Sequence, residues 1–188
     1  MAGSSTAEHP RFYFDLASPQ AYLAAERVNH VLGEVPEWVP VRRELVFRCA
    51  EEVASYREDV ERAARAQGVQ PLRWPDPFPA DSEWAMLAAT YAKQIGRAVA
   101  FSLAAFRQAF AAGRDLSQRD NVLLAAAACE MHPTALDKGA GRDSIRRRLQ
   151  EATDAAGAAG VLEVPAIQVG DRIFHGDREL EAAAAVLA

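Results

Sequence analysis

The sequence predicts an α/β fold in which two β-containing ends enclose a long run of helices. At the amino end, the aromatic run at 12–14 has the composition of a strand and leads into a helical repeat of apolar residues over 20–32. At the carboxyl end, residues 161–174 form a hairpin pattern. Residues 49–159 show helical patterns without an intervening strand. The predicted order is therefore βαβ, consecutive helices and ββα.

The first strand leads through a tight turn into the first helix. Flat aromatic side chains at 12–14 favour a strand. Pro19 suits the first turn of a helix, where its missing N–H costs nothing, and Ser18 before it is a favoured N-cap. The apolar repeat continues to Leu32, and Gly33 ends it. The start of this helix therefore carries a hydroxyl and free N–H groups, which together stabilise an anion.

A second strand is expected over 35–41, with two prolines that favour its ends or an edge position. If it pairs in parallel with the first strand, the two strands and the helix form a right-handed βαβ unit. Arg42, Arg43 and Arg48 then follow the carboxyl end of this strand, where ligands bind in open α/β sheets. These arginines either hold carboxylates of a ligand or form a solvated basic loop.

The middle of the chain is predicted to be helical, because apolar residues recur there at helical spacing between glycines and capping serines. The expected helices span 51–67, 82–95, 98–112, 117–131 and 144–156. The proline-rich stretch 71–79 is expected to be extended, since a residue that precedes proline avoids the helical region. Pro133 and Thr134 are interpreted as an interruption between helices.

The carboxyl end returns to β-structure and closes with a helix. An apolar strand over 161–169 is followed by the Gly170–Asp171 turn, a return strand and an alanine-rich helix that Asp177 caps. This order is that of a thioredoxin-like fold with an all-helical insertion. We expect residues 10–48 and 160–188 to form the thioredoxin-like domain and residues 49–159 to form the helical subdomain.

The composition limits the classes of partner. A formal net charge of −5 argues against nucleic acid. No apolar run reaches the length of a membrane span, and residues 1–9 are expected to be a tail without a secretion signal pattern. We therefore expect a cytoplasmic protein that binds neither nucleic acid nor membrane. Cys49 and Cys129 lie outside any CxxC spacing and the four histidines are scattered, so two free thiols and no metal site are expected.

The run from Phe12 to Tyr22 also points to a family. It has the form strand–Asp–x–x–Ser–Pro–x–x–Tyr, and further motifs follow in order along nearly the whole chain. These motifs are Tyr56 with Asp59 and Arg62, Pro77-Phe-Pro79 with Ser82, Gly160 with Val164-Pro165, and Gly176-Asp177-Arg178. Together they resemble the 2-hydroxychromene-2-carboxylate isomerases and the kappa-class glutathione transferases, members of the DsbA-like thioredoxin superfamily.

The turn at 18–21 distinguishes this chain from thioredoxin-like oxidoreductases. Those enzymes carry Cys-Pro-x-Cys at this place, whereas this chain has Ser18-Pro-Gln-Ala21. Without either thiol, the turn cannot exchange a protein disulfide through a mixed disulfide. The resemblance implies that glutathione, or another low-molecular-weight thiol, places its sulfur beside Ser18, whose hydroxyl and helix start favour the thiolate. The alternative is that Ser18 is only an N-cap.

The resemblance also implies how the rest of glutathione is held. The Val164 backbone would pair with its cysteinyl unit beside a cis Pro165, and Asp177, with Arg178 next to it, would meet the γ-glutamyl amine. From the residues alone, Asp177 is equally well explained as a helix cap, and Pro165 as a trans proline at a strand edge.

The activity that the resemblance implies is the thiol-dependent isomerisation of an aromatic acid like 2-hydroxychromene-2-carboxylate, carried out by a homodimer. Tyr22, Phe47 and Arg48 are predicted to contact this acid. A kappa-type glutathione transferase and a non-catalytic DsbA-like binding protein are the alternatives. The chain departs from the family pattern at Glu163, Ala166 and His175 and in a shortened region at 48–55. These departures favour the binding protein and leave the identity of the thiol open.

Overall fold

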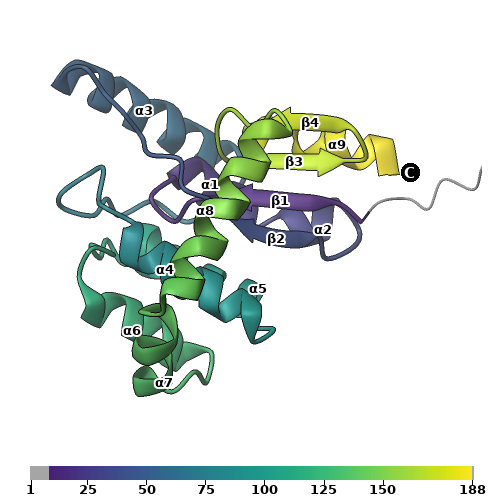
Figure 1. Ribbon diagram of the computed structural model, residues 1–188. Helices are drawn as coiled ribbons and strands as arrows, with labels where there is room; N and C mark the ends of the chain where they lie inside the picture. The colour runs from purple at the N-terminus through teal and green to yellow at the C-terminus, as the bar shows by residue number, and fades with distance from the viewer. Residues whose placement is uncertain (1–8, 188) are drawn as a thin grey trace, which may run out of the picture.

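A mixed four-stranded sheet organises the protein in the computed structural model, which describes residues 9–187 (Figure 1). The strands are β1 (Arg11–Phe14), β2 (Glu37–Pro40), β3 (Ala166–Val169) and β4 (Arg172–His175), in the order β2-β1-β3-β4. β1 runs parallel to β2 and antiparallel to β3, and β3 runs antiparallel to β4. The predicted α/β thioredoxin-like fold is confirmed. Residues 1–8 of the expected tail lie outside the described residues.

Helices make up most of the remaining chain. The α-helices are α1 (Pro19–Ala25), α2 (Val28–Val31), α3 (Ala50–Ala66), α4 (Glu83–Gln94), α5 (Ala98–Phe106), α6 (Arg119–Ala128), α7 (Pro133–Ala140), α8 (Asp143–Ala158) and α9 (Leu180–Leu187). The π-helical turn η1 (Arg107–Ala111) continues α5, and the 3-10 turn η2 (Asp177–Glu179) precedes α9. Within residues 9–187, no helix is both long enough and apolar enough to cross a membrane.

Each face of the sheet has its own apolar cover, because successive side chains of a strand point to opposite faces. Phe12 and Phe14 lie on one face, where both rings meet the Trp38 ring edge to face, at centroid separations of 4.9 and 5.6 Å. Tyr13 lies on the other face and packs in a smaller cluster with Ala156 of α8. α8 crosses the sheet beside β1 and β2 on this side (Figure 1).

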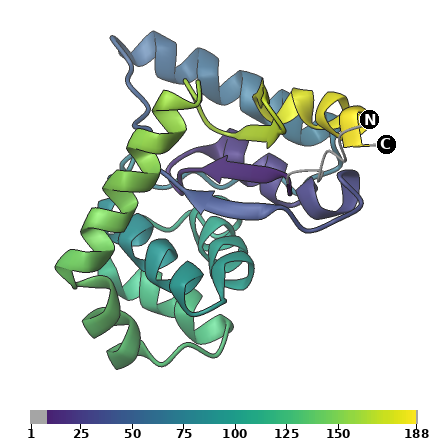
Figure 2. The same cartoon turned by 45° about the vertical axis from the view of Figure 1, so that its right-hand side comes forward.

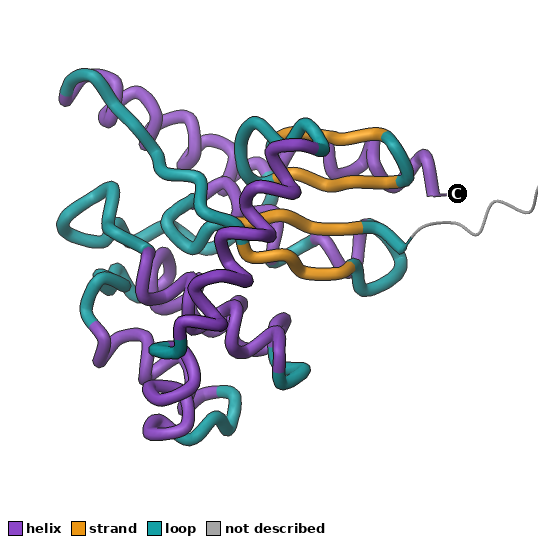
Figure 3. The backbone as a smooth tube through the Cα atoms, viewed as in Figure 1, coloured by secondary structure: helices purple, strands orange, loops and turns teal. Residues whose placement is uncertain are grey.

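The helical part of the chain shares a core with the sheet. α4 packs against α5, α7, α8 and β2. The rings of Phe14 in β1 and Phe106 in α5 lie 5.8 Å apart within the larger apolar cluster. α3 is placed differently, since Figures 1 and 2 both show it apart from α4–α7. Long loops lead into α3 and out of it (Figure 3). The predicted division into a thioredoxin-like domain and a helical subdomain stays a prediction.

The helix predicted over 20–32 is divided into α1 and α2. At the break, Glu26 accepts two hydrogen bonds from Arg107 of η1, and Arg27 pairs with Glu181 of α9. These contacts tie the break to two other elements. The helical pattern that is continuous in the sequence is thus interrupted at the point where Glu26 and Arg27 contact other elements.

Pro133 begins a helix at the place where an interruption is expected from the sequence. It occupies the first turn of α7, where its missing N–H costs nothing. His132 is the N-cap, and its Nδ1 accepts a hydrogen bond from the Thr134 N–H at 3.2 Å. The interpretation as a plain break is therefore wrong, because the same proline that cannot continue one helix starts the next.

Candidate functional site

Ser18 lies at the junction between β1 and α1 and is fully buried. As the N-cap of α1, its Oγ accepts a hydrogen bond from the Ala21 N–H at 3.1 Å. The same hydroxyl donates to the carbonyl oxygen of Val164 at 3.3 Å. The Ser18 side chain therefore faces both the start of a helix and the loop that precedes β3.

The Val164–Pro165 peptide bond is cis, and it lies directly opposite Ser18. Val164 is almost fully buried. The carbonyl of Pro165 accepts a hydrogen bond from the Gly176 N–H at 2.8 Å, which links this loop to the chain just before Asp177. Three segments distant in the sequence thus meet around the turn at Ser18.

Tyr56 of α3 lies close to the Ser18 hydroxyl. Its Oη is buried, and within residues 9–187 no group makes a hydrogen bond of full geometry with it. Burial raises the pKa of this phenol, the nearby Ser18 hydroxyl lowers it, and the charges of Asp177 and Glu163 raise it further. The Tyr56 ring is held by Phe47, with ring centroids 5.3 Å apart. The phenol is therefore neutral near neutral pH and available as a donor.

Asp177 forms a second buried polar position at the start of η2. Its Oδ2 accepts a hydrogen bond from Nε2 of Gln67 at 2.5 Å. The Oε1 atom of Gln67 is buried and has no partner among the described residues. Arg178, in contrast, is exposed. Of these two adjacent residues, only Asp177 is turned into the protein.

Asp15 forms a buried hub directly beneath the turn. Its Oδ1 accepts hydrogen bonds from the Ala17 N–H at 3.0 Å and the Ser82 hydroxyl at 2.6 Å. Its Oδ2 accepts from the Arg43 N–H at 2.9 Å. Burial raises the pKa of the Asp15 carboxyl, although these hydrogen bonds and the charge of Arg42 oppose the shift. This role of Asp15 was not predicted; the available signal in the sequence was a carboxylate between an apolar strand and a Ser-Pro turn.

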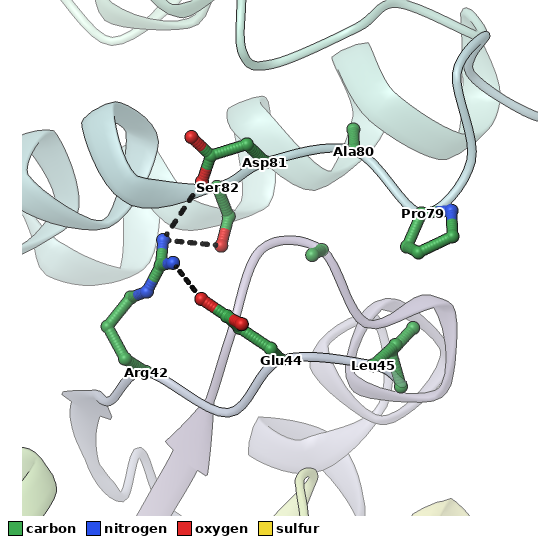
Figure 4. A pocket seen from close by; sticks show the side chains of 8 residues that line it. Arg42, Glu44, Leu45, Pro79, Ala80, Asp81 and Ser82 are labelled. Carbon is green, nitrogen blue, oxygen red and sulfur yellow. Dashed lines mark hydrogen bonds and ion pairs between the residues drawn. The ribbon is translucent and has the colours of Figure 1, made fainter. Parts of the chain in front are cut away.

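A cavity of about 220 Å³ opens beside this hub and is shown in Figure 4. It is lined by Ala17, Arg42, Glu44, Leu45, Pro79, Ala80, Asp81 and Ser82. Arg42 is the cation of the cavity, and its Nη1 donates to Asp81 and to Ser82, each at 3.3 Å. Its Nη2 donates to Glu44 at 2.7 Å. Because Ala17 precedes Ser18 in the chain, the cavity lies next to the turn.

The three residues predicted to bind the substrate lie in two different places. Phe47 and Arg48 line a shallow hollow of about 380 Å³ near the start of α3. Arg48 is exposed there and pairs with Glu52. Tyr22 is buried in the core, where its ring stacks on Phe110 with centroids 5.8 Å apart. The role of these three residues in substrate binding stays a prediction.

Residues 9–187 hold no group of three histidine, cysteine or acidic residues placed to bind a metal ion. Cys49 is exposed and Cys129 is buried, and neither forms a disulfide bond within these residues.

Comparison with known proteins decides the family. The sequence model of the DSBA-like thioredoxin domain matches residues 11–188. The chain belongs to this DSBA-like family. The predicted membership of the DsbA-like superfamily is thereby confirmed, and the family includes both isomerases and oxidoreductases. A search of curated protein sequences found no match.

Solved structures similar to this DSBA-like chain share its fold. A 2-hydroxychromene-2-carboxylate isomerase superimposes with a TM-score of 0.83 at 20% identity, covering 95% of this chain and 93% of that one. The cytosolic disulfide reductase DsbM from Pseudomonas aeruginosa, solved with GSH, has a TM-score of 0.70 at 17% identity, covering 95% and 96%. A DsbA variant from Pseudomonas aeruginosa has a TM-score of 0.63 at 13% identity, covering 100% and 89%.

The residues around the turn fit glutathione, the cofactor that the resemblance implies. Tyr56 Oη and Gln67 Oε1 are buried polar atoms without hydrogen-bond partners in the described part of the chain, and they lie beside Ser18 and Asp177 respectively. Buried polar groups normally have a hydrogen-bond partner, so two such atoms at one site favour a polar ligand. Glutathione carries a thiol and an ammonium group. The hydroxyls of Ser18 and Tyr56 suit the thiol as hydrogen-bond donors. The side-chain oxygens of Asp177 and Gln67 suit the ammonium group as acceptors.

Proposed function

We propose that this protein uses glutathione, or another low-molecular-weight thiol, to isomerise a conjugated aromatic acid of the 2-hydroxychromene-2-carboxylate type. The observation that carries the proposal is the environment of Ser18, a hydroxyl at a helix start that faces the cis Val164–Pro165 bond. The fold shared with an isomerase of this name and with a disulfide reductase solved with GSH supports it.

Ser18 has the chemistry needed to stabilise a thiolate. A free thiol has a pKa of about 8.5, so only a few per cent is ionised at neutral pH. Hydrogen bonds to the charged form lower that pKa. The Ser18 hydroxyl now donates to Val164 at 3.3 Å, which is long for an O–H···O bond. Redirecting it to a charged sulfur therefore exchanges a weak hydrogen bond for a stronger one.

The other residues of the site position the reactants. When bound, glutathione would supply the thiolate nucleophile for reversible addition to the conjugated carbon–carbon bond of the acid. Asp177 binds the ammonium group as a buried carboxylate, with Gln67 Oε1 as a second acceptor. The Val164 backbone, next to Pro165, aligns the cysteinyl unit.

Arg42 is the residue that we assign to the carboxylate of the substrate. It lines the cavity beside Ala17, and its side chain is only 23% exposed. Its partners Glu44 and Asp81 are 71% and 66% exposed, so both are free to turn toward solvent. A guanidinium binds a carboxylate through paired hydrogen bonds. Arg48 suits this role less well, because its side chain is 89% exposed and already paired with Glu52.

A non-catalytic DsbA-like binding protein is the second candidate. The observation in its favour is the complete burial of Ser18, whose hydroxyl already has partners on both sides. A kappa-type glutathione transferase differs from the isomerase only in the release of the adduct. For all three candidates, we propose a homodimer in the cytoplasm.

Titration with glutathione and an isomerase assay on 2-hydroxychromene-2-carboxylate test the proposal. We expect the wild type to bind millimolar glutathione and the Ser18→Ala variant to lose about 10²-fold in turnover, as for removal of one hydrogen-bond donor from a reacting anion. Ser102→Ala is the matched control, because it removes another buried serine hydroxyl, one in α5 that has no hydrogen-bond partner among the described residues. No binding by the wild type, or unchanged turnover in Ser18→Ala, would contradict the proposal.

A further inference from the structure

We propose that Tyr56 is a second hydroxyl donor to the sulfur of the bound thiol, sharing that role with Ser18. The proposal rests on the proposed function, since it assigns a residue to the same site. Tyr56 comes from α3, whereas Ser18 comes from the start of α1, so the two hydroxyls approach the site from different elements.

The state of the Tyr56 hydroxyl is the observation that points to a ligand. Its oxygen is buried, and no described residue makes a full hydrogen bond with it, although the Ser18 hydroxyl is close by. An unpaired buried hydroxyl costs free energy and is uncommon in folded proteins. A ligand atom that accepts hydrogen bonds from both hydroxyls removes this cost. A thiolate beside Ser18 is such an atom.

The surroundings of Tyr56 hold the phenol in place. Its ring packs against Phe47 and stacks on Phe78, with centroids 5.3 and 6.3 Å away. Phe78 in turn meets Trp74 edge to face at 4.8 Å. Because this aromatic cluster spans α3 and the proline-rich segment after it, the hydroxyl is positioned by packing alone. No hydrogen bond within the described residues is lost when Tyr56 donates to a ligand.

Burial, together with two nearby charges, keeps Tyr56 protonated. Asp177 and Glu163 are the charged groups that act on it, and both disfavour a phenolate. Burial acts in the same direction and is the largest effect. Tyr56 therefore keeps its proton and donates a hydrogen bond, and it does not act as a base toward the thiol.

The decisive variant is Tyr56→Phe, which keeps the ring and removes only the hydroxyl. Tyr91→Phe is the matched control, because Tyr91 packs against Gly139 of α7 in the helical part of the chain. The pKa of bound glutathione is measured from the ultraviolet absorbance of its thiolate across a pH series, with each protein saturated. We expect Tyr56→Phe to raise this thiol pKa by about one unit or more, equal to about a tenfold fall in the ionisation constant of the bound thiol. Tyr91→Phe is expected to leave it unchanged.

Stability supplies a second readout. Since the Tyr56 hydroxyl has no hydrogen-bond partner of full geometry among residues 9–187, Tyr56→Phe is expected to unfold at the same or a higher temperature than the wild type. A lower unfolding temperature would show that the hydroxyl serves the fold and would overturn the proposal.

The thiol titration separates this proposal from the proposed function. If the wild type depresses the thiol pKa and Tyr56→Phe depresses it equally, Tyr56 has no role at the sulfur and only this inference fails. If the wild type itself gives no thiolate signal with glutathione, the proposed function fails and the inference with it. An equal shift in the Tyr91→Phe control would also overturn the assignment.

Discussion

Replacing Asp15 tests whether its buried carboxylate holds the site together. In Asp15→Ala, the N–H groups of Ala17 and Arg43 and the hydroxyl of Ser82 lose their acceptor. A buried donor left without a partner costs about 1–3 kcal/mol, and both N–H groups are only partly buried, so we take about 1–2 kcal/mol for each. The buried Ser82 hydroxyl adds about 1–3 kcal/mol, so the free energy of unfolding should fall by about 3–7 kcal/mol in total, as measured by urea denaturation followed by tryptophan fluorescence.

Asp15→Asn is the matched companion, because it keeps one oxygen and removes the charge. The asparagine oxygen still accepts from Ala17 and Ser82, so only the acceptor for Arg43 is lost. We expect a smaller loss than in Asp15→Ala, about a third of it. If Asp15→Ala unfolds within about 0.5 kcal/mol of the wild type, the range of an ordinary surface substitution, the hub is not a structural element.

The pH dependence of the same pair tests the buried charge. Burial raises the pKa of Asp15 in the native state above its unfolded value of about 3.9. The native state then holds this proton more tightly than the unfolded chain does. The stability of the wild type relative to Asp15→Asn should therefore be greatest below about pH 3.9 and decline as the pH rises through the native pKa. A difference that grows with rising pH would refute the reasoning.

Three further substitutions test other parts of the structure. Gly139→Ala places a methyl group 2.3 Å from the Tyr91 ring. Overpacking should therefore lower the free energy of unfolding by about 1–3 kcal/mol. A stability equal to that of the wild type would contradict the packing of α7 against α4. Arg42→Gln should raise the KM for the aromatic acid at least about tenfold and leave glutathione binding intact; an unchanged KM would remove Arg42 from the site. Asp177→Asn should weaken glutathione binding about tenfold or more, as measured by calorimetry. An affinity equal to that of the wild type would show that Asp177 does not bind the ammonium group.

Local signals explain why much of the fold was predictable. The aromatic strand at 12–14, the Ser18–Pro19 helix start and the Gly170–Asp171 hairpin depend on residues that are neighbours in the chain. The long periodic helices were also predicted within a few residues of their observed limits, as for 51–67 against α3. In these places, propensity and tertiary structure favour the same conformation.

Long-range contacts explain what was missed. The break between α1 and α2 lies where Glu26 meets Arg107, a residue far away in the sequence. The site also depends on distant contacts, because Tyr56 of α3 lies close to Ser18, and Asp15 accepts a hydrogen bond from Ser82, the N-cap of α4. The motif identified Ser18, but which side chains surround it depends on how distant elements pack. No local pattern in the sequence carries that information.

A crystal structure of the protein with glutathione is the most direct test of the central claim. The proposed function predicts that the sulfur lies within hydrogen-bond distance of the Ser18 hydroxyl, next to the cis Val164–Pro165 bond, with the ammonium group at Asp177. Glutathione bound elsewhere, such as in the hollow beside Phe47, or with its sulfur away from Ser18, would contradict the claim.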